Sequence, residues 1–281
     1  MQPSTHPPVA SRLPRLPRRR AILVATAMAL SVAYASIATA QPAATPATQE
    51  EYVPDVGQDG KDVIWVPTPQ TLVDKMLDMA KVTPKDRLMD LGSGDGRTVI
   101  TAAQRGLTAQ GIEYNPDLVE LSRRNAQRAG VADRATFVAA DLFQTDLSKA
   151  DVITMFLLST INEKLRPTLL QLPPGTRVVS NTFRMGDWEP DAAETVTKDC
   201  STYCTALLWI VPAKVEGKWE VDGQTLHLTQ QYQMLSGKLG SADISDARLN
   251  GNAISFSANG VRYTGEVNGT VSYTHLTLPT I

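Results

Sequence analysis

The sequence predicts an α/β domain built on a mainly parallel sheet, followed by a smaller antiparallel β segment. Two observations carry this prediction. Between residues 68 and 211, short apolar runs alternate with segments whose apolar residues recur at helical spacing. From residue 217 on, short β-prone runs are separated by Asp-Gly, Ser-Gly and Asn-Gly pairs, which are typical of hairpin turns. The length of 281 residues agrees with about two domains.

Composition excludes several protein classes. The chain is 42% hydrophobic and 20% charged, which is typical of a globular protein and excludes a collagen-like, polytopic-membrane or wholly disordered chain. A net charge of -2 argues against sequence-independent nucleic-acid binding, which needs a basic surface. The two cysteines and three scattered histidines are too few for a disulfide scaffold or a four-ligand zinc site, so no metal is expected.

The N-terminus has the pattern of a targeting segment. Three arginines precede the uncharged residues 21–40, which end in Ala38-Thr39-Ala40, a typical cleavage signal. We therefore expect residues 1–40 to be a signal peptide, or residues 21–40 to be an uncleaved membrane anchor. Either way the folded part would lie outside the cytoplasm, periplasmic or membrane-anchored. Five of the 27 basic residues lie in this segment, so residues 41–281 carry 22 basic and 29 acidic residues.

Each element of the first domain follows from a local pattern. A helix is expected from Thr68-Pro69, because Thr can cap a helix and Pro suits its first position. The first strand is the apolar run Arg87–Leu91, and glycines then lead into a helix that extends to about Arg105. Asn115-Pro116 begins a helix that stops at Gly130. Further strands are expected at residues 109–114, 135–139, 151–158, 176–180 and, antiparallel, 204–211, with a helix at 161–172 interrupted at Pro167.

The chemistry concentrates in the loop after the first strand, which reads Asp90, Leu91, Gly92, Ser93, Gly94, Asp95, Gly96. Glycines let the backbone pass close to a ligand. Their G-x-G-x-G spacing differs from the G-x-G-x-x-G of dinucleotide-binding loops, which argues against a nicotinamide dehydrogenase. Asp90 and Asp95 would repel an anion, whereas a ligand with an ammonium and a sulfonium centre would be attracted.

Two further acids end the next two strands. Glu113 lies about 20 residues after the loop, where a carboxylate can accept hydrogen bonds from both ribose hydroxyls of a nucleoside. Asp141 follows the third strand, in a position to accept from an adenine amino group while Leu142 and Phe143 cover the ring. A simpler interpretation, in which each acid caps a helix or faces water, explains each acid singly but not their joint placement.

Together these motifs resemble the class I S-adenosylmethionine (SAM) dependent methyltransferases over roughly residues 63–211. The resemblance implies a Rossmann-like, seven-stranded, mainly parallel sheet with helices on both faces, and SAM as the cofactor. It also implies that Asp90, with Asp95 and the glycine loop, holds the methionine end, that Glu113 holds the ribose, and that Asp141 and Leu142 hold the adenine. The resemblance assigns no catalytic residue and no metal.

A narrower resemblance concerns the acceptor. The segment Trp65-Val66-Pro67-Thr68-Pro69, the loop 91–97, residues 162–167 and Met185-Gly186-Asp187-Trp188 are similar to bacterial relatives of the seven-strand protein-lysine methyltransferases. Animal members of that group modify mitochondrial membrane proteins. The resemblance implies a protein lysine as acceptor, with a membrane protein as one candidate, and an apolar channel near Trp65 and Phe156. The alternative for Trp65, Phe156 and Trp188 is packing in the core.

Two other functions stay open at this point: a non-enzymatic binding protein that keeps the fold, and a small-molecule methyltransferase. Cys200 and Cys204 could form a disulfide if the chain is exported, or remain free thiols. The expected organisation is a linker at 41–59, the methyltransferase domain at 60–213 and an accessory β domain at 214–270. Residues 271–281 resemble a translated sequencing adapter, so we expect them to be a non-native tail.

Overall fold

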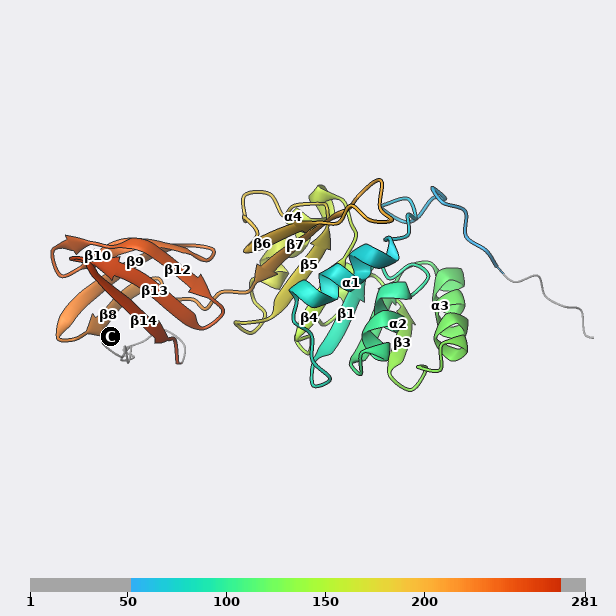
Figure 1. Ribbon diagram of the computed structural model, residues 1–281, viewed down its shortest axis with the longest axis horizontal. Coiled ribbons are helices and arrows are strands. Elements are labelled where there is room, and N and C mark those ends of the chain that lie inside the picture. Colours follow the sequence, from blue (N-terminus) through green and yellow to red (C-terminus); the bar gives the residue numbers. More distant parts are fainter. Residues whose placement is uncertain (1–51, 269–281) are drawn as a thin grey trace, which may run out of the picture. The chain divides into compact units, whose positions relative to one another are not determined.

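The computed structural model describes residues 52–268, which belong to one unit of the chain (Figure 1). The predicted signal peptide or anchor, most of the predicted linker and the predicted tail lie outside the described residues. Among residues 52–268, no helix is long and apolar enough to cross a membrane.

The first sheet has seven strands in the order β3-β2-β1-β4-β5-β7-β6. Strands β1 to β5 pair in parallel, and β7 is antiparallel to both of its neighbours. The predicted mainly parallel seven-stranded sheet and its antiparallel strand are confirmed. Its strands are β1 (Arg87–Leu91), β2 (Thr108–Glu113), β3 (Ala135–Ala139), β4 (Val152–Met155), β5 (Arg177–Asn181), β6 (Ala192–Thr195) and β7 (Thr205–Ile210).

Helix α1 (Gln70–Met79) precedes the first strand, and three helices and a 3₁₀ turn connect the strands that follow: α2 (Arg97–Gln104), α3 (Pro116–Arg128), η1 (Leu142–Gln144) and α4 (Ser159–Leu169). The expected interruption of α4 at Pro167 is wrong, because the helix continues to Leu169. Proline lies in the last turn, where its missing N–H removes one helical bond, and the N–H of Leu170 still donates to the carbonyl of Arg166 (2.9 Å).

Alternate residues of each central strand enter two separate hydrophobic clusters. In β4, Val152 belongs to the first cluster and Ile153 to the second. Residues of α1, α2 and α3 complete the first cluster, and Ile161, Leu165 and Leu169 of α4 belong to the second. This period-two alternation is what a sheet buried on both faces requires.

The second sheet is antiparallel, with its own hydrophobic cluster around Trp219 and Phe256, and confirms the predicted β meander. The expected turn at Ser236-Gly237 is wrong, because Gly237 lies inside a strand, where a Cβ would come within 1.8 Å of the His227 carbonyl oxygen. Turns do occur at Asp222-Gly223 and Asn259-Gly260. The strands are β8 (Gly217–Val221), β9 (Gln224–Gln231), β10 (Met234–Leu239), β11 (Ala242–Asp243), β12 (Ser245–Asn250), β13 (Ala253–Ala258) and β14 (Val261–Glu266).

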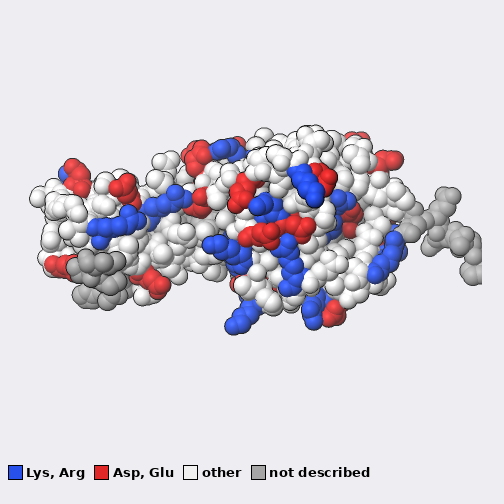
Figure 2. All heavy atoms as spheres, viewed as in Figure 1, with Lys and Arg blue, Asp and Glu red and all other residues white. Residues whose placement is uncertain are grey.

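Charged residues of both signs are interspersed on the surface. Figure 2 shows lysines and arginines beside aspartates and glutamates over the face that it draws. Several of these pairs are in direct contact; Arg105, for example, bonds Asp74 (2.8 Å) and Asp78 (2.6 Å). Exposed pairs of this kind contribute little to stability.

The turn between β1 and α2 sets the position of the loop predicted to bind the cofactor. Gly92, Gly94 and Gly96 all have positive φ angles, of 75°, 55° and 83°. A Cβ on Gly96 would lie 2.8 Å from the Phe137 ring and 2.9 Å from the Ser122 Cβ. Helix α3 holds the loop as well, because the Ser122 hydroxyl donates to the Gly94 carbonyl (2.9 Å). Only glycine fits both the conformation and the space at residue 96.

We predict that Gly96→Ala lowers the free energy of unfolding by about 2–4 kcal/mol, because it combines left-handed strain with a collision in the core. Gly130→Ala is the matched control. Gly130 also has a positive φ, of 69°, but no atom lies within 4 Å of its Cβ position, so this variant should lose about 1 kcal/mol. Urea unfolding monitored by circular dichroism measures both. Equal losses would contradict the packing described for Gly96.

Candidate functional site

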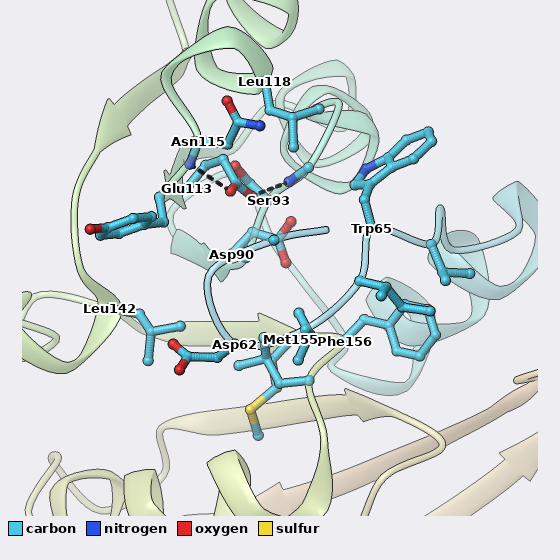
Figure 3. Close-up of a pocket in the computed structure, with 18 of the residues that line it drawn as sticks. Asp62, Trp65, Asp90, Ser93, Glu113, Asn115, Leu118, Leu142, Met155 and Phe156 are labelled. Atoms are coloured by element: carbon cyan, nitrogen blue, oxygen red, sulfur yellow. Dashed lines mark hydrogen bonds between the residues drawn. The ribbon is translucent and has the colours of Figure 1, made fainter. Parts of the chain in front are cut away.

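A cavity of about 470 Å³ opens at the carboxyl ends of β1, β2 and β4, a size typical of small-molecule sites. The structure brings almost all of the predicted site residues together here. Asp90, Gly92, Ser93, Gly94, Asp95, Glu113, Asp141, Leu142, Trp65 and Phe156 all line the cavity. Gly96 is not among the lining residues; it lies against Phe137 and Ser122 instead. In Figure 3, Glu113 and Leu142 lie on one side of the cavity, Trp65 and Phe156 on the other, and Asp90 between them.

Asp90 is the buried charge of the site. Only 6% of the residue is exposed, and its Oδ1 accepts a hydrogen bond from the Thr154 hydroxyl (2.6 Å). Burial raises the pKa of the Asp90 carboxyl to about 7; the Thr154 bond opposes the shift, and the charges of Glu113 and Asp95 add to it. Within residues 52–268, no lysine or arginine forms an ion pair with Asp90. The carboxylate is therefore poised for a positively charged ligand.

Glu113 ends β2 and supports the glycine loop directly. Its Oε2 accepts from the Gly94 N–H (2.9 Å) and its Oε1 from the Asn115 N–H (3.0 Å), as the dashed lines in Figure 3 show. These bonds keep the side chain at the cavity wall and hold the loop against β2. A carboxylate oxygen has a second lone pair, so each oxygen can still accept from a ligand hydroxyl.

Asp95 is neutralised within the loop. Arg97 Nη2 contacts Asp95 Oδ2 at 2.6 Å, and Nη1 of the same side chain donates to the Thr68 carbonyl (2.8 Å). Arg97 therefore ties the glycine loop to the segment that precedes α1. Because Asp95 already has a cation, Asp90 and Glu113 carry the uncompensated negative charge beside the glycine loop.

Asp141 has two partners. Its Oδ1 accepts from the Phe143 N–H (2.9 Å) and so caps η1, and its Oδ2 accepts from Lys61 Nζ (2.7 Å). The hydrogen bond from Lys61 holds the pKa of the Asp141 carboxyl below its ordinary value. Lys61 also lies over the Tyr114 ring, 4.7 Å from its centroid. Asp141 thus caps a helical turn and lines the cavity at the same time. Leu142 lines the cavity as expected, whereas Phe143 is exposed and absent from the lining.

The opposite end of the cavity is aromatic. Phe156, after β4, stacks on Phe183, after β5 (6.0 Å between centroids), and both rings contact Tyr203 in the β6–β7 loop. Sequence reasoning missed Phe183 and Tyr203. The signal for Phe183 was available, because it lies two residues after the end of a parallel strand, at the edge where ligands bind in such sheets. Tyr203 lies between Cys200 and Cys204, which form a disulfide.

Trp65 and Trp188 have different surroundings. Trp65 lines the cavity and covers the glycine loop, since a Cβ on Gly94 would lie 2.7 Å from Trp65 Nε1. Trp188 is fully buried, and its Nε1 donates to Gln233 Oε1 (2.9 Å). The core interpretation is therefore correct for Trp188 and wrong for Trp65 and Phe156.

Among residues 52–268, no group of three or more His, Cys, Asp or Glu side chains could hold a metal ion.

These residues fit a ligand that carries positive charge on a nucleoside-like body. A buried carboxylate without a cation would gain a partner, Glu113 keeps acceptor lone pairs at the wall, and apolar side chains such as Leu118 and Leu142 flank the space between them. S-adenosylmethionine, with its ammonium, sulfonium, ribose and adenine groups, has this chemistry.

Comparisons with known proteins agree with this chemistry. The ANTKMT methyltransferase domain family matches residues 90–192. A protein-lysine N-methyltransferase of Saccharolobus islandicus is 41% identical over 152 residues, which is 53% of this chain and 94% of that protein. The adenine nucleotide translocase lysine N-methyltransferase of Mus musculus is 38% identical over 122 residues, or 43% of this chain and 53% of that protein. The chain thus spans little more than half of the mouse relative.

A solved structure extends the comparison to the fold. An RNA methyltransferase from Salinibacter ruber, in complex with S-adenosyl-L-homocysteine, is 49% identical with a TM-score of 0.50. The match covers 53% of this chain and 96% of that one. The cofactor of the present chain is therefore S-adenosylmethionine. The chain belongs to the family of SAM-dependent methyltransferases that includes these protein-lysine N-methyltransferases.

Proposed function

We propose that this protein transfers a methyl group from SAM to the side-chain amine of a protein lysine. The observation that carries the proposal is the division of one cavity into an acidic end, with Asp90 and Glu113, and an aromatic end, with Phe156, Phe183 and Tyr203. A cationic cofactor suits the first end, and a long aliphatic side chain with an amine tip suits the second. The names of the relatives support the lysine acceptor.

Each residue at the acidic end has a proposed role. Asp90 would hold the cofactor ammonium, Glu113 the ribose hydroxyls, and Asp141 and Leu142 the adenine. The backbone of the glycine loop would pass beneath the ligand, because Gly92 and Gly94 have no side chains to obstruct it. Asp141 Oδ2 accepts from Lys61 in the free protein and keeps a second lone pair for the adenine amine. When bound, SAM supplies a methyl group activated by the sulfonium charge.

The aromatic end would prepare the acceptor. A lysine amine attacks only in its neutral form, and its ordinary pKa is about 10.4. An apolar channel lowers that pKa, because burial disfavours the charged form. Phe156, with the neighbouring Met155 and Leu157, provides such surroundings. Alignment of the amine and exclusion of water are the contributions that this chain makes to the rate.

We also propose that the folded domain acts outside the cytoplasm. The charge pattern of residues 1–40 supports export, and the Cys200–Cys204 disulfide suits an oxidising compartment. Residues 21–40 could retain the protein at the membrane, where a membrane protein would be the natural acceptor. Protease added to spheroplasts, in which the outer membrane is opened and the inner membrane is intact, should digest the domain, and complete protection would contradict export.

The lysine acceptor can be tested by labelling. The purified protein is incubated with radiolabelled SAM in three separate reactions. The acceptor is heat-denatured bacterial protein in the first, total RNA in the second and a small-molecule extract in the third. We expect label in the protein, and acid hydrolysis should release it as methyl-lysine. The RNA sample matters because the Salinibacter neighbour is described as an RNA methyltransferase. Label in RNA or in small molecules, with none in lysine, would refute the proposal.

A second prediction concerns protons released when SAM binds. The pKa of Asp90 is raised from 3.8 to about 7, so at about pH 6 the free protein carries a proton there. The cofactor ammonium favours the ionised carboxylate, so binding should release close to one proton at about pH 6, where the α-amino group of SAM, with an ordinary pKa of about 8, is already charged. Calorimetry in buffers of different ionisation enthalpy measures this number.

Two variants check the assignment to Asp90. Asp90→Asn should abolish the release at about pH 6 and weaken SAM binding, because the asparagine cannot ionise. Asp133→Asn is the matched control, since Asp133 is exposed and lies outside the cavity lining; it should release the same number of protons as the wild type. Proton release that survives in Asp90→Asn would show that another group titrates.

A further inference from the structure

Tyr203 is the part of the aromatic end that comes from a loop. It lies between β6 and β7, where residues 197–199 and 201–203 are exposed. Its ring centroid is 5.3 Å from that of Phe156 and 5.6 Å from that of Phe183. It lines the cavity while 39% of the residue remains exposed, so its ring stands at the opening on the acceptor side.

The disulfide constrains where this ring lies. Cys200 and Cys204 close a five-residue ring that contains Ser201, Thr202 and Tyr203. Tyr203 has a φ angle of 57°, in the left-handed region that is unfavourable for a bulky residue and persists where the surroundings enforce it. At the end of the loop, the Val196 N–H donates to the Cys204 carbonyl (2.9 Å), which anchors the closed ring to the sheet.

A lysine side chain that enters the cavity needs an apolar wall along its methylene stem and gains from an aromatic face near its amine. The rings of Phe156 and Phe183 follow strands of the sheet, so their backbone positions are set by the fold. Tyr203 depends instead on its short loop. The acceptor end of the cavity is therefore complete when the loop holds Tyr203 against the two phenylalanines.

We propose that Tyr203 binds the acceptor lysine and that the Cys200–Cys204 disulfide positions it, so that reduction of the disulfide weakens acceptor binding and leaves SAM binding unchanged. This inference rests on the proposed lysine methylation. It adds an acceptor-binding residue and a redox-dependent element to that site. The disulfide itself takes no part in methyl transfer.

The test measures initial rates at saturating SAM while the concentration of heat-denatured bacterial protein is varied. Tyr203→Ala should raise the KM for the acceptor about five- to tenfold, because an aromatic contact is lost, with the Kd of SAM unchanged. Tyr203→Phe keeps the ring and should raise the KM less than Tyr203→Ala does. Lys198→Ala, an exposed position in the same loop outside the cavity lining, is the control and should behave like the wild type.

The disulfide is tested in the same assay. Cys200→Ser/Cys204→Ser should raise the KM, and dithiothreitol should raise the wild-type KM to the same level with no effect on the double variant. Adding Tyr203→Ala to the double variant should raise the KM by a smaller factor than it does in the wild type, because the two changes affect one contact. Wild-type KM values in Tyr203→Ala, or in both the double variant and the reduced protein, would overturn the inference.

Failure of the proposed function gives a different result. A wild-type protein that binds SAM but forms no methyl-lysine would refute lysine methylation, and this inference with it. A wild-type protein that methylates lysine while the Tyr203 and cysteine variants keep the wild-type KM would refute this inference alone.

Discussion

The turn between β1 and α2 is the constraint on which the site depends. Its three glycines with positive φ fold the backbone so tightly that Gly94 reaches Glu113 on the next strand and the Ser122 hydroxyl on α3. This turn sets Asp90, Asp95 and Glu113 around one cavity. Such an arrangement raises the energy of the free protein, because Asp90 is buried beside two other carboxylates. A cationic ligand stabilises these carboxylates. Affinity for the cofactor therefore follows from the excess negative charge that the fold places in the cavity.

The excess negative charge lies at one end of the cavity. Arg97 pairs with Asp95 and Lys61 pairs with Asp141, whereas Asp90 and Glu113, beside the glycine loop, form no ion pair among the described residues. The other end holds three aromatic rings, from the segments that follow β4 and β5 and from the β6–β7 loop. A charged cofactor and an amine that must become neutral need opposite surroundings. One cavity with a polar and an apolar end provides both.

Much of the fold was predictable because local patterns were strong. The strand Arg87–Leu91 occurs with the predicted bounds, and the acids at three strand ends meet at one edge, as a parallel sheet requires. Strand β6 was missed, because its four exposed residues pair at the edge of the sheet and show no apolar run. Gly237 indicated a turn, but it lies inside β10, where the absence of a side chain lets the backbone of β9 come close. Tyr203 and Lys61 could not be placed, because loop residues reach the cavity through tertiary contacts that no periodicity records.

The central claim is that Asp90 and Glu113 bind the cofactor while the aromatic end faces the acceptor. A crystal structure of the protein with S-adenosylhomocysteine tests it most directly. We expect the amino group beside Asp90, the ribose hydroxyls on Glu113, the adenine between Asp141 and Leu142, and the sulfur directed toward Phe156 and Tyr203. A ligand bound in the reverse direction, or outside this cavity, would contradict the account.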